Sequence, residues 1–238
     1  HLPWSATDFR RHVEQVEEAM PDGGWPNYVL GNHDETRLSK RIGPEQLRLA
    51  AMLLLTLRGT PTLYYGDEIG IPDAPIPAHE QQDPHGRSQP GAGRDGCRTP
   101  MQWEASPGSG FTTESDRSWL PFSPDWPKRN VETQLAEPGS LLNLYRDLLE
   151  LRRSEPALRA GRYQPLADLP VSVFGYLRAL GDDTFAILLN FGSEAVALAS
   201  PVGGNVVLST ALGWPTQVEV GHRVRLEAGQ GCIIRLRD

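Results

Sequence analysis

The chain reads WPNYVLGNHD at residues 25–34 and GTPTLYYGDEIG at residues 59–70. In each stretch a short apolar run leads into turn residues and polar side chains, which is typical of a strand buried on both faces. A predicted helix over residues 5–20 precedes the first stretch, and a second over residues 44–57 lies between the two, because both carry apolar residues at three- and four-residue spacing. The order helix, strand, helix, strand predicts a parallel α/β sheet.

The rest of the chain changes character twice. Residues 70–138 are rich in Pro, Gly, Asp and Ser, and so long a connection in a compact protein is usually functional. Helical spacing returns over residues 140–154. Beyond residue 161, short apolar segments follow at nearly regular intervals, which predicts an antiparallel β-sandwich or barrel. The sequence therefore indicates an α/β plus all-β fold, with one domain over residues 1–160 and a second over residues 161–238.

Composition excludes several classes of function. The 238 residues include 23 Lys plus Arg against 30 Asp plus Glu, for a net charge of −7, so neither a nucleic acid nor an anionic membrane is an expected partner. No apolar stretch reaches the ~20 residues of a membrane helix, and no signal peptide is recognisable. We therefore expect a cytoplasmic protein. The two cysteines, Cys97 and Cys232, form no metal-binding pattern, and no cofactor or metal is expected.

The triplet Asn32-His33-Asp34 directly follows the first predicted strand. In parallel α/β sheets the carboxyl ends of the strands gather the residues that face a ligand. These side chains are therefore candidates for a functional site. The alternative is that they only stabilise the loop.

Three motifs, in this order, resemble the family 13 glycoside hydrolases of the α-amylase clan. Residues 25–34 look like the seventh barrel strand and the fourth signature region of that family, and residues 59–70 look like its eighth strand. Residues 93–103, GRDGCRTPMQW, resemble the long loop of the oligo-1,6-glucosidase and α-glucosidase branch. The resemblance implies the C-terminal part of a TIM (β/α)8 barrel, strands 7 and 8, followed by an antiparallel β-sandwich domain.

The resemblance also implies roles for single residues. Asp34 matches the third catalytic carboxylate, which binds the distorted sugar and stabilises the oxocarbenium-like transition state. His33 matches the neighbouring imidazole, which bonds hydroxyls of the same sugar. Arg94 matches an arginine that pairs with a carboxylate near the closed end of the pocket and helps to bind the substrate. The alternative for Arg94 is a solvated loop arginine.

Other polar and aromatic residues have weaker claims. Asp67 and Glu68 are expected to stabilise the turn after the second strand rather than to catalyse. Glu35 and Arg37 either border the next sugar site or face solvent, as loop charges usually do. Three aromatic side chains of the long loop either stack on sugar rings or pack the loop itself: Trp103, Phe111 and Trp119.

The resemblance covers only the end of the family's catalytic domain. Retaining glycosidases need a nucleophile and an acid/base carboxylate roughly 5 to 5.5 Å apart, and in the family these lie on the fourth and fifth strands. Because the chain opens with His1 rather than Met, we expect it to be a fragment that is inactive alone. Its expected partners are a short α-glucoside oligosaccharide and either the missing N-terminal part of the barrel or a second copy of the chain.

The parent protein is expected to be a retaining α-glucosidase-type hydrolase that acts on short α-glucosides. One alternative is a transglucosylase or isomerase of the same family, such as a trehalose or isomaltulose synthase. A second is the non-catalytic ectodomain of an amino-acid-transporter heavy chain, although such proteins usually lose residues of the kind that His33 and Asp34 supply. A third makes the sandwich a sugar-binding module, which would require exposed aromatic residues. Five aromatic residues there mostly occupy inward-looking positions: Phe174, Tyr176, Phe185, Phe191 and Trp214.

Overall fold

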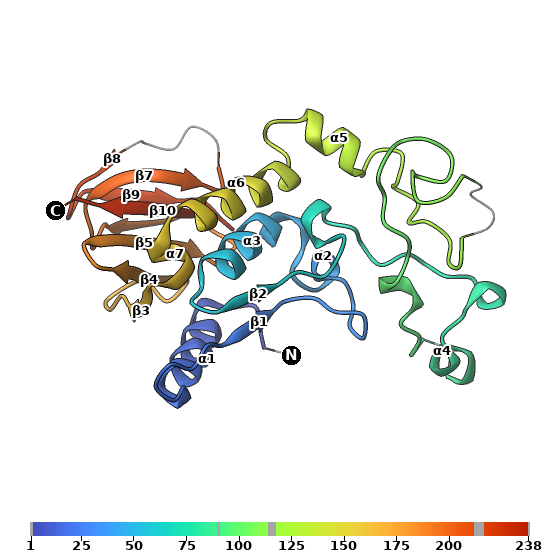
Figure 1. Ribbon diagram of the computed structural model, residues 1–238, viewed down its shortest axis with the longest axis horizontal. Helices are drawn as coiled ribbons and strands as arrows, with labels where there is room; N and C mark the ends of the chain where they lie inside the picture. The colour runs from blue at the N-terminus through green and yellow to red at the C-terminus, as the bar shows by residue number, and fades with distance from the viewer. Residues whose placement is uncertain (1, 90, 114–117, 212–216, 238) are drawn as a thin grey trace. The chain divides into compact units, whose positions relative to one another are not determined.

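The computed structural model describes most of the chain (Figure 1). The described residues are 2–89, 91–113, 118–211 and 217–237. They cluster into two compact units, each of which is described by itself. The first unit holds residues 1–28, 48–61 and 146–238, and the second holds residues 29–47 and 62–145.

The chain begins with helix α1 (Ala6–Ala19). Ser5 has an extended backbone, and its hydroxyl accepts a hydrogen bond of 3.1 Å from the backbone N–H of Asp8, which caps the helix. Phe9 and Val13 lie on its buried face. The predicted helix over residues 5–20 therefore forms within one residue of its expected bounds.

Strands β1 (Asn27–Val29) and β2 (Thr60–Thr62) are hydrogen-bonded neighbours in a two-stranded sheet. The N–H of Thr60 donates to the carbonyl of Pro26 at 2.8 Å. Both strands are shorter than the apolar runs that predict them, residues 25–30 and 60–65. The expectation that they are buried on both faces is wrong for this chain, since Val29 is 47% exposed. The reason is that the sheet ends at these two strands, so each has only one neighbour.

Between these strands lie α2 (Leu38–Ile42), a 3₁₀ turn η1 (Pro44–Gln46) and α3 (Leu47–Thr56). The sequence predicts the last two as one helix and does not predict α2, whose five residues are too few to show a period. Residues 49–53 of α3 are fully buried on every face. A helix that is apolar all round is a core helix rather than a surface one.

After α6 (Leu141–Ser154) and the unpredicted short helix α7 (Pro156–Ala160), the chain forms an antiparallel β-sandwich. A six-stranded sheet has the order β3-β4-β5-β10-β7-β8, and β6 pairs with β9 in a second sheet. All strand pairs described in the sandwich are antiparallel, as predicted. The strands are β3 (Arg162–Pro165), β4 (Val173–Leu180), β5 (Asp183–Asn190), β6 (Val196–Ala199), β7 (Gly204–Ser209), β8 (Gln217–Val218), β9 (Arg223–Leu226) and β10 (Gly231–Leu236).

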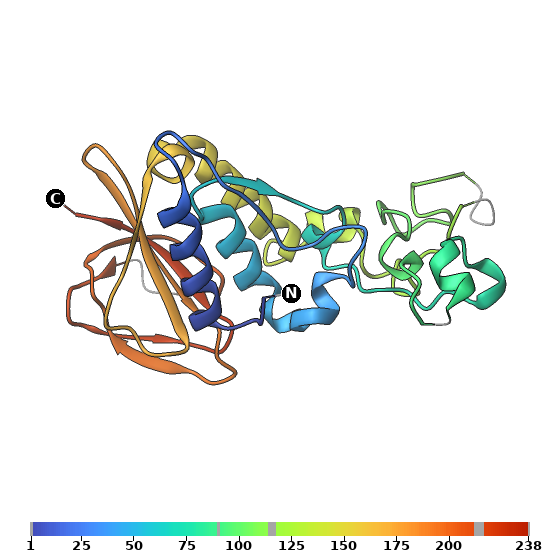
Figure 2. The ribbon, with the colours of Figure 1, turned by 90° about the horizontal axis from the view of Figure 1, so that it is seen from below.

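Helices α1 and α3 lie along one side of the six-stranded sheet (Figure 2). The ring of Phe9 lies 5.5 Å from that of Phe191, and the hydroxyls of Thr56 and Tyr176 are 2.6 Å apart. Four aromatic residues of the sandwich are buried: Phe174, Tyr176, Phe185 and Phe191. This agrees with their predicted inward positions, while Trp214 lies outside the described residues.

Two arginines tie the end of α3 to later parts of the first unit. The guanidinium of Arg152, from α6, donates to the carbonyls of Leu55 and Leu57 at 2.8 and 3.0 Å. Arg178, from β4, donates to the carbonyl of Thr56 at 2.5 Å. The last carbonyls of a helix have no partner within the helix. The two cations therefore satisfy groups that would otherwise be buried without hydrogen bonds.

The described parts of the long segment, residues 70–89, 91–113 and 118–138, contain only short elements, as its composition predicts. They are η2 (Asp67–Ile69) just before it, then η3 (Ala78–Glu80), α4 (Pro84–Ser88), η4 (Asp95–Cys97) and α5 (Val131–Ala136). In the described part of the chain, no helix combines the length and the apolar character needed to cross a bilayer.

Candidate functional site

The candidate site begins where β1 ends, in the second unit. Gly31 is the second residue after β1, and a side chain there would meet the carboxylate of Asp67. Glycine at this position therefore leaves room for the Asp67 carboxylate, which comes from the turn after β2. The side-chain oxygen of Asn32 then accepts a hydrogen bond of 2.8 Å from the N–H of Asp34, which shapes the loop that carries the candidate residues.

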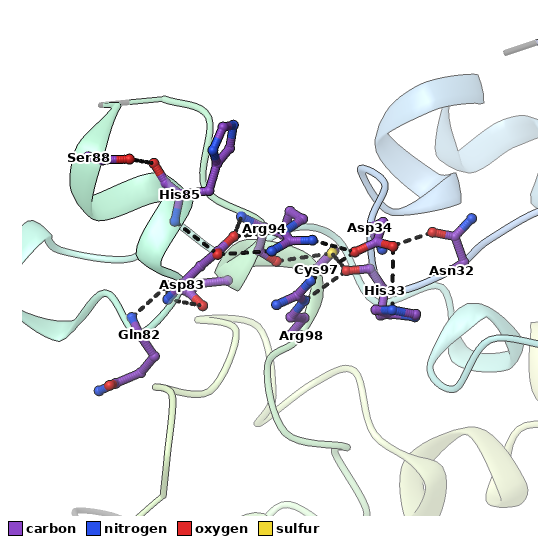
Figure 3. A network of polar contacts seen from close by, with 11 residues as sticks. Asn32, His33, Asp34, Gln82, Asp83, His85, Ser88, Arg94, Cys97 and Arg98 are labelled. Atoms are coloured by element: carbon purple, nitrogen blue, oxygen red, sulfur yellow. Dashed lines mark hydrogen bonds and ion pairs between the residues drawn. The ribbon is translucent and has the colours of Figure 1, made fainter.

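The Asp34 carboxylate is the centre of a polar cluster (Figure 3). Its Oδ1 accepts hydrogen bonds from Arg94 Nη1 at 2.7 Å and from Arg98 Nη2 at 3.0 Å. His33 Nε2 lies 3.4 Å from its Oδ2. The side chain of Asp34 remains 50% exposed. The structure therefore brings together the three site residues that the sequence predicts.

Arg94 is held from the other side by Asp83. Its Nε and Nη2 donate to the two oxygens of the Asp83 carboxylate at 2.8 and 3.0 Å, and its backbone N–H donates to the same group at 2.9 Å. Asp83 is buried, and it caps α4 by accepting from the N–H of His85. The alternative of a freely solvated Arg94 does not hold. This two-point geometry fixes the direction in which the guanidinium reaches Asp34.

Arg98 is a site residue that the sequence reasoning missed. Besides its bond to Asp34, its Nε donates to the carbonyl of His33 at 2.8 Å. The buried Cys97 thiol donates to the carbonyls of Arg94 and His33 at 3.0 and 3.4 Å. The segment over residues 94–98 therefore clamps the loop after β1 through side chains and backbone together. Only the presence of a second arginine near Arg94 in the sequence could have indicated this contact.

The charges of the cluster set its protonation. Loss of hydration alone would raise the pKa of Asp34, but the hydrogen bond from Arg94 and the charges around it lower that pKa below its usual value. The same guanidinium also lowers the pKa of Asp83. Asp34 is therefore ionised at neutral pH. It suits the stabilisation of positive charge and does not suit the donation of a proton.

A polar cavity of about 360 Å³ lies beside Asp34 and Arg94. Its lining includes Glu35, Lys40 and Asp73. Its size falls within the range of small-molecule sites, about 300 to 1,000 Å³. Glu35 thus borders a cavity next to Asp34.

Arg37 departs from the expectation of a solvent-facing loop charge. It is 1% exposed, and its guanidinium lies over the rings of Tyr64 and Tyr65, 4.7 and 4.6 Å from their centres. It also donates a hydrogen bond to the carbonyl of Tyr65. A cation stacked on two rings in a desolvated place is a favourable arrangement. Arg37 therefore joins the loop after β1 to the segment after β2.

Asp67 and Glu68 lie in η2, between Gly66 and Gly70, which both adopt left-handed backbone conformations. Burial raises the pKa of Asp67 to about 7, against the opposing charge of Arg37. Burial also raises the pKa of Glu68. These two carboxyls lie inside the turn, in keeping with the structural role that the sequence suggests.

A second cavity, of about 380 Å³, lies beside Arg98 in the same unit. We call it the aromatic cavity, because most of its wall is aromatic or aliphatic. Nine residues line it: Tyr65, Glu68, Arg98, Pro100, Met101, Trp103, Phe111, Trp119 and Leu120. The three aromatic side chains singled out in the sequence, Trp103, Phe111 and Trp119, are thus brought together and are 49%, 53% and 61% exposed. They face a cavity instead of being buried within the loop.

His, Cys, Asp and Glu side chains are the usual protein ligands of a metal ion. Over residues 2–89, 91–113, 118–211 and 217–237, no three of them are arranged so that they could hold a metal ion. The acidic residues of the cluster, Asp34 and Asp83, are instead joined by a guanidinium.

Comparison with known families decides the classification. The family model "Alpha amylase, catalytic domain" matches residues 2–161. The chain belongs to the α-amylase family. The match includes the loop after β1, the turn after β2 and the segment over residues 94–98. The family resemblance inferred from the three motifs is thereby confirmed.

Curated relatives include enzymes and a transporter subunit. Maltase A1 of Drosophila melanogaster is 36% identical over 199 residues, which cover 81% of this chain and 34% of that protein. Oligo-1,6-glucosidase of Parageobacillus thermoglucosidasius is 27% identical over 225 residues, covering 84% and 40%. The amino acid transporter heavy chain SLC3A1 of Rattus norvegicus is 37% identical over 227 residues, covering 91% and 32%. The chain thus spans about a third to two fifths of these relatives.

Solved structures resemble almost the whole chain. The trehalulose synthase MutB of Pseudomonas mesoacidophila MX-45 matches with a TM-score of 0.84 and 25% identity, over 98% of this chain and 47% of that one. An isomaltulose synthase mutant of Erwinia rhapontici NX5 matches with a TM-score of 0.84 and 28% identity, over 99% and 47%. The fold is therefore the end of a (β/α)8 barrel followed by an antiparallel β-sandwich, as predicted.

Proposed function

We propose that the protein to which this chain belongs is a retaining α-glucosidase-type hydrolase that acts from the non-reducing end of short α-glucosides. The observation that carries the proposal is the Asp34 cluster. An ionised carboxylate, held by Arg94 and Arg98 and flanked by His33, directly follows a strand of an α-amylase-family barrel.

The chemistry of this reaction requires a fixed negative charge. Cleavage of a glycosidic bond passes through an oxocarbenium-like transition state, in which positive charge develops on the sugar. A preorganised carboxylate stabilises that charge without the cost of reorienting water. Because its pKa is lowered, Asp34 carries its charge over the whole neutral range. In this proposal it is the transition-state stabiliser.

His33 and Arg94 are proposed to bind the substrate. The side chain of His33 is 68% exposed and its Nε2 lies beside the same carboxylate, so its ring can reach a sugar hydroxyl next to Asp34. Arg94 is fixed by Asp83 and points at Asp34, so it limits the space at that end of the polar cavity. The nucleophile and the acid/base carboxylate are proposed to come from the part of the barrel that precedes this chain.

The experiment that tests the proposal uses the full-length protein. It should release glucose from maltose, isomaltose and an aryl α-glucoside, with the α-configuration retained in the first product seen by NMR. Release of β-glucose, or no turnover of any of the three, would contradict the proposal.

A second candidate is transglucosylation or isomerisation of an α-glucoside. It is favoured by the solved structures, which include a trehalulose synthase and an isomaltulose synthase. The products formed from sucrose distinguish the isomerase from the hydrolase. An isomerase converts it mainly to a disaccharide isomer, whereas a hydrolase releases equal amounts of glucose and fructose.

A non-catalytic role is the third candidate, and it is favoured by the similarity to amino acid transporter heavy chains. Such a role needs neither His33 nor an ionised Asp34. If the full-length protein binds no α-glucoside and hydrolyses none, while a membrane transporter copurifies with it, this candidate replaces the first.

An α-glucoside oligosaccharide is the proposed substrate, and the upstream part of the barrel or a second copy is the proposed neighbour of β1 and β2. We propose a cytoplasmic location and a domain boundary near residue 160, where α7 ends and β3 begins.

A further inference from the structure

Helix α2 follows the loop that carries His33 and Asp34, and none of the proposed roles uses it. It begins directly after Arg37, whose carbonyl accepts hydrogen bonds from the backbone N–H groups of Lys40 and Arg41 at 3.0 and 3.2 Å. The helix has only five residues, and a helix of this length is not stable by itself. It must therefore be held in place by the chain around it.

Two residues anchor α2 to the segment after β2. The backbone N–H of Arg37 donates to Asp73 Oδ1 at 2.9 Å, and its guanidinium is stacked on two tyrosine rings. The hydroxyl of the buried Ser39 donates to the carbonyl of Ile71 at 3.0 Å. Both anchors lie at the N-terminal end of the helix. They fix the position of its last turn, which carries Arg41.

Arg41 reaches back from α2 to both ends of the loop after β1. Its Nε donates to the carbonyl of Thr36 at 2.9 Å, and its Nη2 donates to the carbonyl of Leu30. The segment between these two carbonyls, residues 31–35, contains Asp34. One guanidinium therefore bridges the two ends of the segment that carries the proposed stabilising carboxylate.

The shape of the arginine side chain suits this bridge. A guanidinium presents its N–H donors in a fixed plane, so two of them can bind two separate carbonyls at the same time. The charge of Arg41 has a separate effect: burial raises the pKa of Asp67, and the charges of Arg37 and Arg41 oppose this rise. The ammonium group of lysine carries the same charge at a single point. Arg41→Lys therefore keeps the charge and breaks the bridge.

We propose that Arg41 is a positioning residue, which holds residues 31–35 so that Asp34 keeps the geometry needed at the transition state. Arg94 and Arg98 hold the Asp34 carboxylate itself, whereas Arg41 holds the backbone that carries it. The effect on the loop is independent of any activity, and the effect on catalysis rests on the proposed glucosidase function. A displacement of about 1 Å can cost a hundredfold in rate, so a loosened loop should lower kcat more than it raises KM.

The test compares Arg41→Met and Arg41→Lys with the parent, all in the full-length protein. Hydrogen exchange followed by mass spectrometry measures the protection of residues 31–35. Arg41→Met loses both hydrogen bonds of the bridge, so these amides should exchange about tenfold faster. With an aryl α-glucoside, Arg41→Met should lower kcat about 10- to 100-fold and change KM less than about threefold. Arg41→Lys keeps at most one of the two bonds, and both of its values should lie between those of Arg41→Met and the parent.

The matched control is Arg153→Met, which removes an exposed arginine of α6 and should leave both kcat and the exchange of the loop as in the parent. In every variant the amides of β5 should keep their protection, which separates a loosened loop from a loosened fold.

Three results would overturn the proposal: unchanged loop exchange in Arg41→Met, faster loop exchange with an unchanged kcat, or an Arg41→Lys protein that behaves as the parent does. A fall in kcat that occurs only together with lost protection of β5 would also overturn it, because Arg41 would then stabilise the fold as a whole. If the parent hydrolyses no α-glucoside, the glucosidase function fails, and the exchange of the loop still decides whether Arg41 holds it.

Discussion

Replacement of the buried Arg178 by methionine should destabilise the first unit. Arg178 has no exposed surface, and its guanidinium donates to the carbonyl of Thr56 at 2.5 Å and to that of Gly161 at 2.9 and 3.3 Å. It thus joins the end of α3 and the residue after α7 to strand β4. Arg178→Met keeps most of the side-chain volume and removes every one of these hydrogen bonds.

The magnitude follows from two opposing effects. A buried carbonyl that loses its partner costs about 1–3 kcal/mol, and two of them lose theirs. Against this, burial of a cation is itself unfavourable, as the lowering of the pKa of Arg178 to about 10 by desolvation indicates. Relief of that burial offsets part of the loss. The expected net destabilisation is about 2–4 kcal/mol.

Urea denaturation of the chain, followed by far-ultraviolet circular dichroism, measures this effect. The matched control is Arg153→Met on α6, whose side chain is 77% exposed and should matter by less than about 0.5 kcal/mol. If Arg178→Met changed the free energy of unfolding no more than Arg153→Met does, the carbonyls of Thr56 and Gly161 would have other hydrogen-bond partners. The proposed anchoring of α3 would then be wrong.

Three further results are expected. The pKa of Asp67 is about 7 in the folded state instead of 3.8, so the folded state holds this proton more tightly than the unfolded state. The free energy of unfolding should therefore fall as pH rises from about 4 to about 7, by on the order of 4 kcal/mol, since each pKa unit corresponds to about 1.4 kcal/mol. Asp67→Asn should remove that fall, and a pH profile that Asp67→Asn leaves unchanged would contradict this account. In hydrogen exchange, the amide of Val29, in a three-residue strand, should exchange much faster than that of the fully buried Ile187, and equal protection would show that the two-stranded sheet is self-sufficient. The chain by itself should not hydrolyse an aryl α-glucoside, because a charge stabiliser without nucleophile or acid offers no route to cleavage; turnover that disappears in Asp34→Asn would contradict this.

Much of the fold follows from local patterns. The periods of α1, α3 and α6 and the alternation of the sandwich strands are visible in the sequence because each spans enough residues to repeat. The short elements α2, α7 and β3 were missed, since four or five residues carry no readable period. The exposure of β1 and β2 depends on which strands lie beside them, and that is not a local property of the sequence.

The candidate site was predictable in part. Asp34, His33 and Arg94 were identified from motifs, and the structure places them together. The partners that fix them were not: Asp83 caps a short helix, Arg98 reaches back to the loop after β1, and Arg37 is buried between two tyrosines. These contacts join residues about 11 to 65 positions apart, and sequence spacing does not encode such distances.

The most direct measurement of the central claim is the value of kcat/KM for an aryl α-glucoside with the full-length protein carrying Asp34→Asn. Asp22→Asn, which makes the same change in an exposed turn, serves as the control. We expect Asp34→Asn to lower kcat/KM about a thousandfold or more, mainly through kcat, with the fold unchanged and Asp22→Asn fully active. An Asp34→Asn protein that retains activity within about tenfold of the parent would contradict the assignment of Asp34 as the stabilising carboxylate.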